Sequence, residues 1–327
     1  MKIIIGRRAI HIGILATHKN EEIQRLEDAA KAAGHEVKTL DVKEFGVHIS
    51  LCKPEIRYGG KSVEGEFDAI IPRIDIPYTS IGFKILRQFQ AAGVYVVDTA
   101  YSLELARNKL RCLQYLQKQE VQFPATGFSY ASKGYDSIIR LMGQPPFVIK
   151  LNEGTQGTGV FLADDEKTAR NLLKTFAQLD TEVMLQEFIQ ESQGEDLRCF
   201  VVGGKVVAAM RRKSQDGDFR ANISLGGHAY DVDLTDEERD ISIKAAEAIK
   251  LNVAGVDVIR SERGPLVIEI NGAPDFTGEY GLEKISGVDV AGEIIKYAEE
   301  GKARYDRGEG VWLEPDTDLT PQLVNKA

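Results

Sequence analysis

Cysteine is scarce in this chain. Only 3 of the 327 residues are cysteines, and they lie far apart, at Cys52, Cys112 and Cys199. No CxxC pair occurs, which excludes a disulfide framework and the usual paired-cysteine metal and redox motifs. Unpaired, widely spaced cysteines are typical of a reducing compartment, so we predict a cytoplasmic protein.

Long apolar runs and positive charge are also in short supply. No stretch approaches the ~20 residues of a membrane-spanning helix, and the first residues lack the apolar core and cleavage site of a signal peptide. Lys and Arg total 41 against 50 Asp and Glu, a formal net charge of −9. Such a chain lacks the basic surface that binds nucleic acid generally. We therefore expect no membrane and no direct nucleic-acid partner.

The first hundred residues alternate apolar runs with amphipathic segments. Helices are expected after Asn20 and after Ser80, ending at Gly34 and Gly93. Four short apolar runs separated by such segments predict a parallel sheet in an α/β unit. The expected strands cover 10–15, 35–40, 67–72 and 94–97, and the unit is expected to span 1–98.

Beyond this unit the pattern changes to short strands mixed with helices, an α+β arrangement. One continuous helix is expected from Ser102 to Leu116, and a polar loop is expected over 213–230. Thr235 and Glu238 form a capping box that predicts another helix start. We expect units at 99–182 and 183–301, followed by a tail at 302–327.

A glycine-rich segment lies between two short apolar runs. It reads Lys150-Leu-Asn-Glu-Gly154-Thr-Gln-Gly157-Thr-Gly159-Val160. Consecutive N–H groups of such a loop can bind phosphate oxygens, and Lys150 adds a positive charge. The segment contains neither G-x-x-x-x-G-K-[ST] nor G-x-G-x-x-G. Strand-like runs flank it on both sides, so a helix dipole is not the phosphate anchor here. A mobile hairpin tip with a solvated lysine is the alternative interpretation.

A second informative segment runs from Ala254 to Asn271. A three-residue loop at 262–264 would pair Ser261 with Pro265 and place Asp257 opposite Glu269. Asn271 would share their face of the ladder, while the other face would carry Val256, Val258, Ile268 and Ile270. Two carboxylates and an amide are oxygen ligands that suit Mg²⁺. A hairpin whose polar face simply meets water is the alternative.

Other catalytic arrangements are poorly represented. The five histidines, His11, His18, His35, His48 and His228, show no metal-binding spacing, and no GxSxG sequence occurs. These residues are therefore interpreted as packing or surface residues.

Several ordered motifs together resemble the ATP-grasp superfamily, and more closely the RimK family of α-L-glutamate ligases, over about residues 10–300. Besides the two segments above, the motifs are Ile71-Pro-Arg-Ile74, Ala106-Arg-Asn-Lys-Leu-Arg-Cys112, Gln186-Glu-Phe-Ile189, Gly194-Glu-Asp-Leu-Arg198 and Gly217-Asp-Phe-Arg-Ala-Asn222. The resemblance implies an ATP-grasp fold with an N-terminal parallel-sheet pre-ATP-grasp domain. It also implies a homo-oligomer, a tetramer in this family.

The resemblance implies an ATP-dependent ligase that makes an amide through an acylphosphate. It implies ATP and Mg²⁺, with Mn²⁺ as a substitute, and glutamate added to the C-terminus of a small-subunit ribosomal protein, to a peptide or to polyglutamate. The implied residues are Lys109, Lys150 and the loop glycines Gly154, Gly157 and Gly159 at the phosphates, Glu187 and Phe188 at the adenine, Asp196 near the ribose, Arg220 and Asn222 at the reacting phosphate, and Asp257, Glu269 and Asn271 around Mg²⁺.

Two positions depart from the family pattern. Phe188 stands where the family commonly has Tyr, and Asn271 is followed by Gly272-Ala-Pro-Asp275-Phe276-Thr-Gly-Glu279-Tyr280 in place of Ser-Pro-Gly-apolar-Glu-Gly. The second change borders the acceptor side. A small-molecule acceptor, a kinase, or a nucleotide-binding protein without ligase turnover therefore remain as alternatives.

An anionic substrate needs a local cationic site, because the whole chain carries −9. Arg73, Arg211 and Arg212 are the candidates outside the nucleotide set, since Arg holds a carboxylate through two parallel hydrogen bonds. A solvated strand end is the alternative for Arg211 and Arg212.

Overall fold

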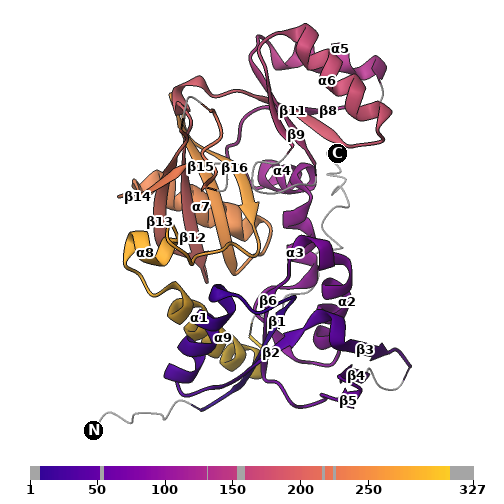
Figure 1. Cartoon of the computed structure of the whole chain (residues 1–327), viewed down its shortest axis with the longest axis vertical. Helices are drawn as coiled ribbons and strands as arrows, with labels where there is room; N and C mark the ends of the chain where they lie inside the picture. Colours follow the sequence, from indigo (N-terminus) through magenta and orange to yellow (C-terminus); the bar gives the residue numbers. More distant parts are fainter. Residues whose placement is uncertain are drawn as a thin grey trace, which may run out of the picture.

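The structure is a computed structural model that describes residues 8–51, 55–130, 132–152, 159–215, 218–223 and 226–309. Figure 1 shows three stacked parts, with the N-terminal sheet at the bottom, the sheet of β12–β16 in the middle and the sheet of β8–β11 at the top. Within these described ranges, no helix combines the length and the apolarity that crossing a bilayer requires.

The N-terminal sheet has the strand order β2-β1-β6-β7, and every pairing in it is parallel, as the alternating pattern predicts. Its strands are β1 (His11–Ala16), β2 (Glu36–Asp41), β6 (Ala69–Arg73) and β7 (Tyr95–Val96). The apolar side chains of β1 alternate between two clusters, because successive side chains of a strand point to opposite faces. Both faces of the sheet are therefore covered.

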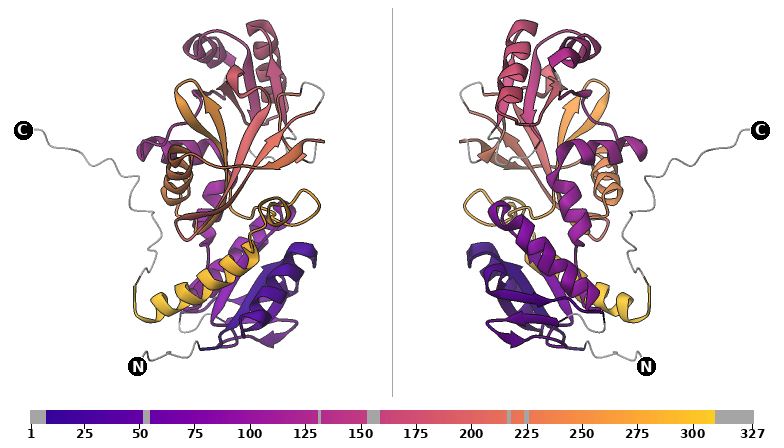
Figure 2. Two further views of the ribbon diagram at one scale, coloured as in Figure 1. Left: turned by 90° about the vertical axis from the view of Figure 1, so that its left-hand side faces the viewer. Right: turned by 90° about the vertical axis from the view of Figure 1, so that its right-hand side faces the viewer.

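Helices from both ends of the described chain cover this sheet. Asn20 caps α1 (Glu21–Ala32) by accepting a hydrogen bond from the backbone of Ile23. The long α9 (Val290–Asp306) packs beside α1, and Figure 2 shows it running along the N-terminal part. On the other face lies α2 (Thr79–Ala91), preceded by the 3-10 turn η2 (Ile76–Tyr78).

A small antiparallel sheet, absent from the sequence-based expectation, projects from this part. It has the order β3-β4-β5 and follows the turn η1 (Val42–Glu44). Its strands are β3 (Phe45–His48), β4 (Glu55–Tyr58) and β5 (Lys61–Ser62).

The single helix expected after Ser102 is wrong in two respects. Thr99 is the cap, so α3 (Ala100–Arg107) begins earlier, and the helix breaks at Asn108 before α4 (Lys109–Lys118). The side chain of Asn108 accepts a hydrogen bond from the backbone of Arg111 and thereby starts a new helix. The break places Lys109 at the first position of α4.

The uppermost part is an antiparallel sheet with the order β10-β9-β11-β8. Its elements are β8 (Thr126–Phe128), α5 (Ser132–Met142), β9 (Phe147–Leu151), β10 (Val160–Ala163), α6 (Glu166–Gln178) and β11 (Val183–Glu187). The two helices pack on one another and on one face of the sheet. The other face is left for the site.

The middle part is an antiparallel sheet with the order β14-β13-β12-β15-β16. Its elements are η3 (Gln190–Ser192), β12 (Glu195–Val202), β13 (Lys205–Lys213), β14 (His228–Asp231), α7 (Asp236–Ala248), β15 (Val253–Ser261), β16 (Gly264–Asn271) and α8 (Leu282–Ser286). The capping box of α7 is confirmed. The expectation of an unbroken loop over 213–230 is wrong, because β14 pairs with the end of β13.

A buried carboxylate joins the N-terminal sheet to the middle sheet. Asp98, 2% exposed, accepts hydrogen bonds from the backbone N–H groups of Asn252 (2.7 Å) and Val253 (3.3 Å). The side chain of Asn252 in turn donates to the carbonyl of Val97 (2.6 Å). These bonds fix the end of β7 against the start of β15, and burial raises the pKa of Asp98 to about 7.

Asp98→Asn should remove a pH dependence of stability. The folded-state pKa lies above the ordinary value of 3.8, so the folded protein binds more protons between pH 4 and 7 and this contribution to stability is lost as pH rises. The free energy of unfolding of the wild type, measured in urea, should fall relative to that of the variant by up to ~1.4 kcal/mol per pH unit over that interval. A difference that stays constant from pH 4 to 7 would contradict the assignment.

Candidate active site

The hairpin β15–β16 brings Asp257 and Glu269 together as predicted, but its turn and its register differ from the predicted ones. The turn contains two residues, since Ser261 pairs with Gly264, not with Pro265. A one-residue slip of this kind should send Asp257 and Glu269 to opposite faces. A β-bulge between Asp257 and Val258 adds the missing residue, so Asp257 pairs with Glu269 as predicted.

The bulge also changes which residues face the core. Val267 is fully buried, whereas Ile268, predicted on the core face, is half-buried and lines a cavity together with Ile259. Val256, Val258 and Ile270 are buried as predicted. One wall of the hairpin therefore offers both carboxylates and apolar surface to the same cavity.

This first cavity lies between the upper and middle sheets. Its apolar end includes Pro124, Val148, Phe188 and Phe219, and the rings of Phe188 and Phe219 meet edge to face at 6.1 Å. At its polar end it gathers most of the residues predicted at the nucleotide. These are Lys109, Lys150, Glu187, Asp196, Arg220, Asn222, Asp257 and Glu269.

Two lysines from distant segments reach this cavity. Nζ of Lys109 lies 3.3 Å from a carboxylate oxygen of Glu269. Lys150 has no carboxylate within 4.0 Å among the described residues, and burial lowers its pKa to about 8. Asn152 holds the two segments together, because its carbonyl accepts from the N–H of Lys109 and its side chain accepts from the N–H of Leu110. A half-buried ammonium with no carboxylate beside it can take an anionic ligand as its partner.

Of the predicted loop glycines, only Gly159 lies within the described residues. Its φ is +79°, and a Cβ there would come within 2.3 Å of the Leu151 side chain. A larger residue would therefore disturb both the backbone and the cavity wall. Gly154 and Gly157 lie outside the described residues.

Several predicted nucleotide residues already have protein partners. Glu187 accepts a hydrogen bond from the backbone of Ala125 (3.1 Å) and pairs with Arg263 at the β15–β16 turn. Arg220 pairs with Asp218 (2.7 Å). These contacts orient the side chains at the cavity, and their roles at a nucleotide stay predictions.

Each carboxylate of the predicted metal set also faces a cation. Glu269 faces Lys109, while Asp257, 2% exposed, pairs with Arg198 and with Arg212 (3.0 Å). Burial alone would raise the pKa of Asp257, but the two guanidinium groups hold it below its ordinary value. Asp257 is therefore ionised and its charge is neutralised by arginine.

The donor set fits a divalent cation by its chemistry. Asp257 and Glu269 are cross-strand neighbours, and the buried amide nitrogen of Asn271 has no hydrogen-bond partner among the described residues. A half-turn of that amide presents its oxygen instead, which is a ligand for Mg²⁺. The described part of the chain holds no group of three His, Cys, Asp or Glu that could bind a metal, so a metal held here would need the Asn271 amide as a ligand.

A second, larger cavity lies against the first. It is bounded by the carboxyl ends of β1 and β6 and by residues 273–281 after β16, including Asp275, Glu279 and Tyr280 from the segment that departs from the family pattern. Arg212, Asn222 and Glu269 line both cavities. These three residues form the shared wall, where a ligand in one cavity would meet a ligand in the other.

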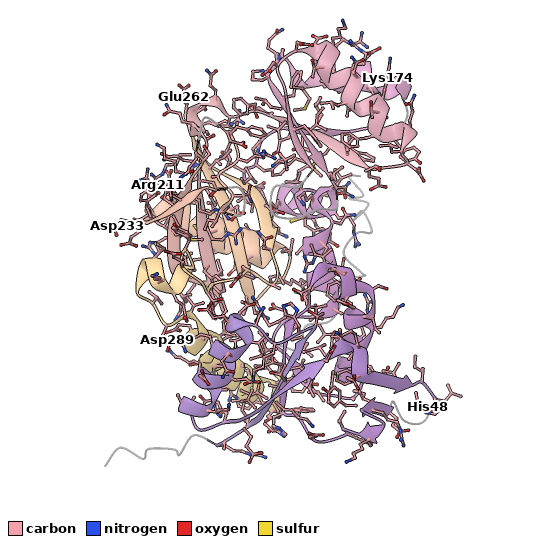
Figure 3. The ribbon with its side chains drawn as sticks, viewed as in Figure 1. His48, Lys174, Arg211, Asp233, Glu262 and Asp289 are labelled. Carbon is pink, nitrogen blue, oxygen red and sulfur yellow. The ribbon has the colours of Figure 1, made fainter. Side chains whose placement is uncertain are left out.

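Of the three arginines predicted for an acceptor site, Arg73 and Arg212 line the second cavity and Arg211 does not. Arg211 and Arg212 point to opposite faces of β13, as neighbours in a strand do. Arg211 pairs with Glu195 (3.1 Å), lies over the Tyr230 ring and sits at the outer margin of the middle sheet in Figure 3. Arg212 is buried at the shared wall and donates two 2.7 Å hydrogen bonds to Asp196.

Arg73 lies in the second cavity. It is buried, pairs with Glu22 and donates to the carbonyl of Pro274 (2.6 Å). Arg107 and Arg198 line the same cavity and were not among the predicted site residues. Arg107 lies two positions before Lys109 in the motif that begins at Ala106. The predicted continuous helix did not include the break at Asn108, which directs these two residues to different cavities.

Comparison with known proteins agrees with this architecture. Residues 10–103 match the family model described as the RimK PreATP-grasp domain, and residues 106–298 match the one described as the RimK-like ATP-grasp domain. A protein of Nitrosococcus oceani named probable alpha-L-glutamate ligase is 45% identical over 281 residues, covering 86% of this chain and 92% of that protein. One of the same name from Thioalkalivibrio sulfidiphilus is 47% identical over 277 residues, covering 85% and 91%.

Solved structures share the fold at lower identity. The ATP-grasp ligase PsnB, complexed with a minimal precursor, superposes with a TM-score of 0.70 at 18% identity, covering 89% of this chain and 98% of that one. At this identity the likeness concerns the fold.

Proposed function

The chain belongs to the RimK-like ATP-grasp family, and from this premise we propose that it is an ATP-dependent α-L-glutamate ligase. It joins the amino group of glutamate to the C-terminal carboxylate of a protein or peptide. The observation that carries the proposal is the shared wall, since Arg212, Asn222 and Glu269 line both the first and the second cavity. ATP in the first cavity would thereby place its terminal phosphate beside a carboxylate in the second.

The proposed reaction has two steps. The carboxylate oxygen attacks the γ-phosphorus of ATP, ADP leaves, and an acylphosphate forms; the amine then attacks the acyl carbon and inorganic phosphate leaves. Lys109 and Lys150 neutralise the phosphates, and Arg220 and Asn222 approach the transferred group. Phosphoryl transfer depends mainly on such positioning and charge neutralisation.

Asp257, Glu269 and Asn271 would hold Mg²⁺, and Mn²⁺ is a candidate substitute. The metal supplies charge neutralisation at the phosphates. To free Glu269 for the metal, Lys109 would move from Glu269 to a phosphate. Arg198 and Arg212 would balance the part of the Asp257 charge that the metal does not. Phe188 and Phe219 would enclose the adenine, and Asp196 would lie near the ribose.

The domain division proposed with this function places residues 1–98 in the pre-ATP-grasp domain, 99–182 and 183–301 in the two halves of the ATP-grasp, and 302–327 in a tail. The second cavity then lies between the pre-ATP-grasp sheet and the 183–301 half. A cavity open to both parts suits an extended acceptor, and the PsnB neighbour was solved with a precursor. Homo-oligomer formation and a cytoplasmic location remain predictions from the sequence.

The proposed function predicts amide formation coupled to ADP release. With ATP, Mg²⁺, glutamate and a peptide ending in glutamate, product masses should rise in steps of one glutamyl residue, with one ADP per step. Hydroxylamine in place of glutamate should trap the acylphosphate as a hydroxamate. A phosphorylated product that persists and carries no amide would instead indicate the kinase alternative. Amide formation on a cofactor precursor but not on the peptide would indicate a small-molecule ligase.

A further inference from the structure

The second cavity contains Arg107, a cation that no carboxylate of the described residues approaches to ion-pair distance. The cavity has a volume of about 710 Å³, within the ~300–1,000 Å³ of typical ligand sites. Four arginines line it, and they are Arg73, Arg107, Arg198 and Arg212. Five carboxylates line it as well, so an anionic substrate would need a local cation that these carboxylates do not pair with.

Three of the four arginines are neutralised internally. Arg73 pairs with Glu22, Arg198 pairs with Asp257, and Arg212 pairs with Asp196 and Asp257. Arg107 differs from them, because no carboxylate oxygen of the described residues lies within 4.0 Å of it. Its guanidinium donates one hydrogen bond, to the carbonyl of Ile74 (3.0 Å).

The surroundings make this cation unusual. Burial lowers the pKa of Arg107, and Asp75 and Glu269 offset this only from beyond ion-pair distance. Arg107 in turn acts on the neighbouring Arg73 as a like charge that lowers the pKa of Arg73. Buried charges in proteins are normally paired, so a ligand carboxylate at this point would supply the missing partner.

An unused donor lies in the same place. The Arg73 side chain is only 3% exposed, and its buried Nε has no hydrogen-bond partner among the described residues. A carboxylate near Arg107 and Arg73 would relieve their repulsion and satisfy this donor. A guanidinium holds a planar carboxylate through parallel hydrogen bonds.

We propose that Arg107 binds a substrate carboxylate in the second cavity, with Nε of Arg73 as a second donor. This inference rests on the proposed function and adds to it the residue that selects an acidic substrate. The break at Asn108 gives the arrangement its geometry, because Lys109 on one side serves the first cavity and Arg107 on the other serves the second.

Arg107→Gln tests the assignment. The KM for either glutamate or the acceptor peptide should rise ~10- to 100-fold while the KM for ATP stays within about twofold, as expected for loss of one charge-assisted bond. The substrate whose KM rises identifies the source of the carboxylate. Arg111→Gln, an exposed arginine over the Tyr101 ring and outside both cavities, is the matched control and should change neither KM.

Direct binding separates this inference from the proposed function. Calorimetric titration of L-glutamate and of a Glu-Glu dipeptide, with AMPPNP and Mg²⁺ present, should show weaker binding of one of them to Arg107→Gln. If the variant binds one ligand more weakly but the wild type shows no turnover, the proposed ligase function is contradicted and the role of Arg107 is supported. If Arg107→Gln does not fold, Arg107→Lys decides by the same measurements. Unchanged KM and Kd for both ligands in a folded variant would overturn the assignment.

Discussion

Glu269→Gln is expected to lower turnover at least ~100-fold, the scale seen when one electrostatic stabiliser of a transition state is lost. Glu269 lies on the shared wall, opposite Asp257 across the ladder and 3.3 Å from Lys109. Glutamine keeps the shape but removes the charge that a divalent cation requires. The fold should persist, because Val267 and Ile270 anchor β16 in the core.

The measurement is ADP formation at saturating ATP over a range of Mg²⁺ concentrations, together with the melting temperature. Glu262→Gln is the matched control, since Glu262 is exposed at the β15–β16 turn and is labelled at the periphery of Figure 3. It should leave turnover unchanged. A folded Glu269→Gln protein with a near-normal rate would exclude Glu269 from the metal site.

Lys150→Met should weaken ATP binding by ~10- to 100-fold, the cost of one lost charge-assisted contact to phosphate. Methionine keeps most of the length of the side chain and removes the ammonium. The melting temperature of the free protein at pH 7 should not fall, because burial lowers the pKa of Lys150 to about 8 and holding the charge there costs folding free energy. A variant that simply unfolds would show that Lys150 is structural.

The same lysine predicts a pH dependence. Below pH 8 Lys150 is charged before ATP arrives, whereas above pH 8 it must take up a proton on binding. The affinity of the wild type for ATP should therefore fall by up to ~10-fold per pH unit above 8, and Lys150→Met should lack this decline. Lys174→Met, on the exposed surface of α6 and labelled in Figure 3, should behave as the wild type in nucleotide titrations.

The hairpin β15–β16 shows where sequence reasoning succeeded and where it could not. A register counted from the turn placed Asp257 opposite Glu269, and the structure confirms that pairing. The predicted turn was wrong by one residue, and the bulge beside Val258 compensated for it. A bulge leaves no clear trace in the sequence, since it is selected by the packing of both faces of the ladder.

The helix break at Asn108 is a second feature that the sequence pattern did not predict. Local periodicity favours one continuous helix, but the Asn108 cap and the contacts of Asn152 with the start of α4 make the chain stop and restart there. The contacts of Asn152 come from the residue that follows β9, more than forty residues away. Intrinsic helix propensity cannot register them, because it depends on neighbouring residues alone.

By itself the sequence determined the parallel N-terminal sheet, the ATP-grasp family and the segments that meet at the first cavity. Each of these depends on local periodicity or on ordered motifs. The tertiary structure decided which charges are already paired. Arg73 and Arg212, predicted as candidates for a carboxylate site, are paired with Glu22 and with Asp196 and Asp257, whereas no carboxylate of the described residues pairs with Arg107. Charge pairing depends on distances between segments far apart in the chain, which residue spacing does not encode.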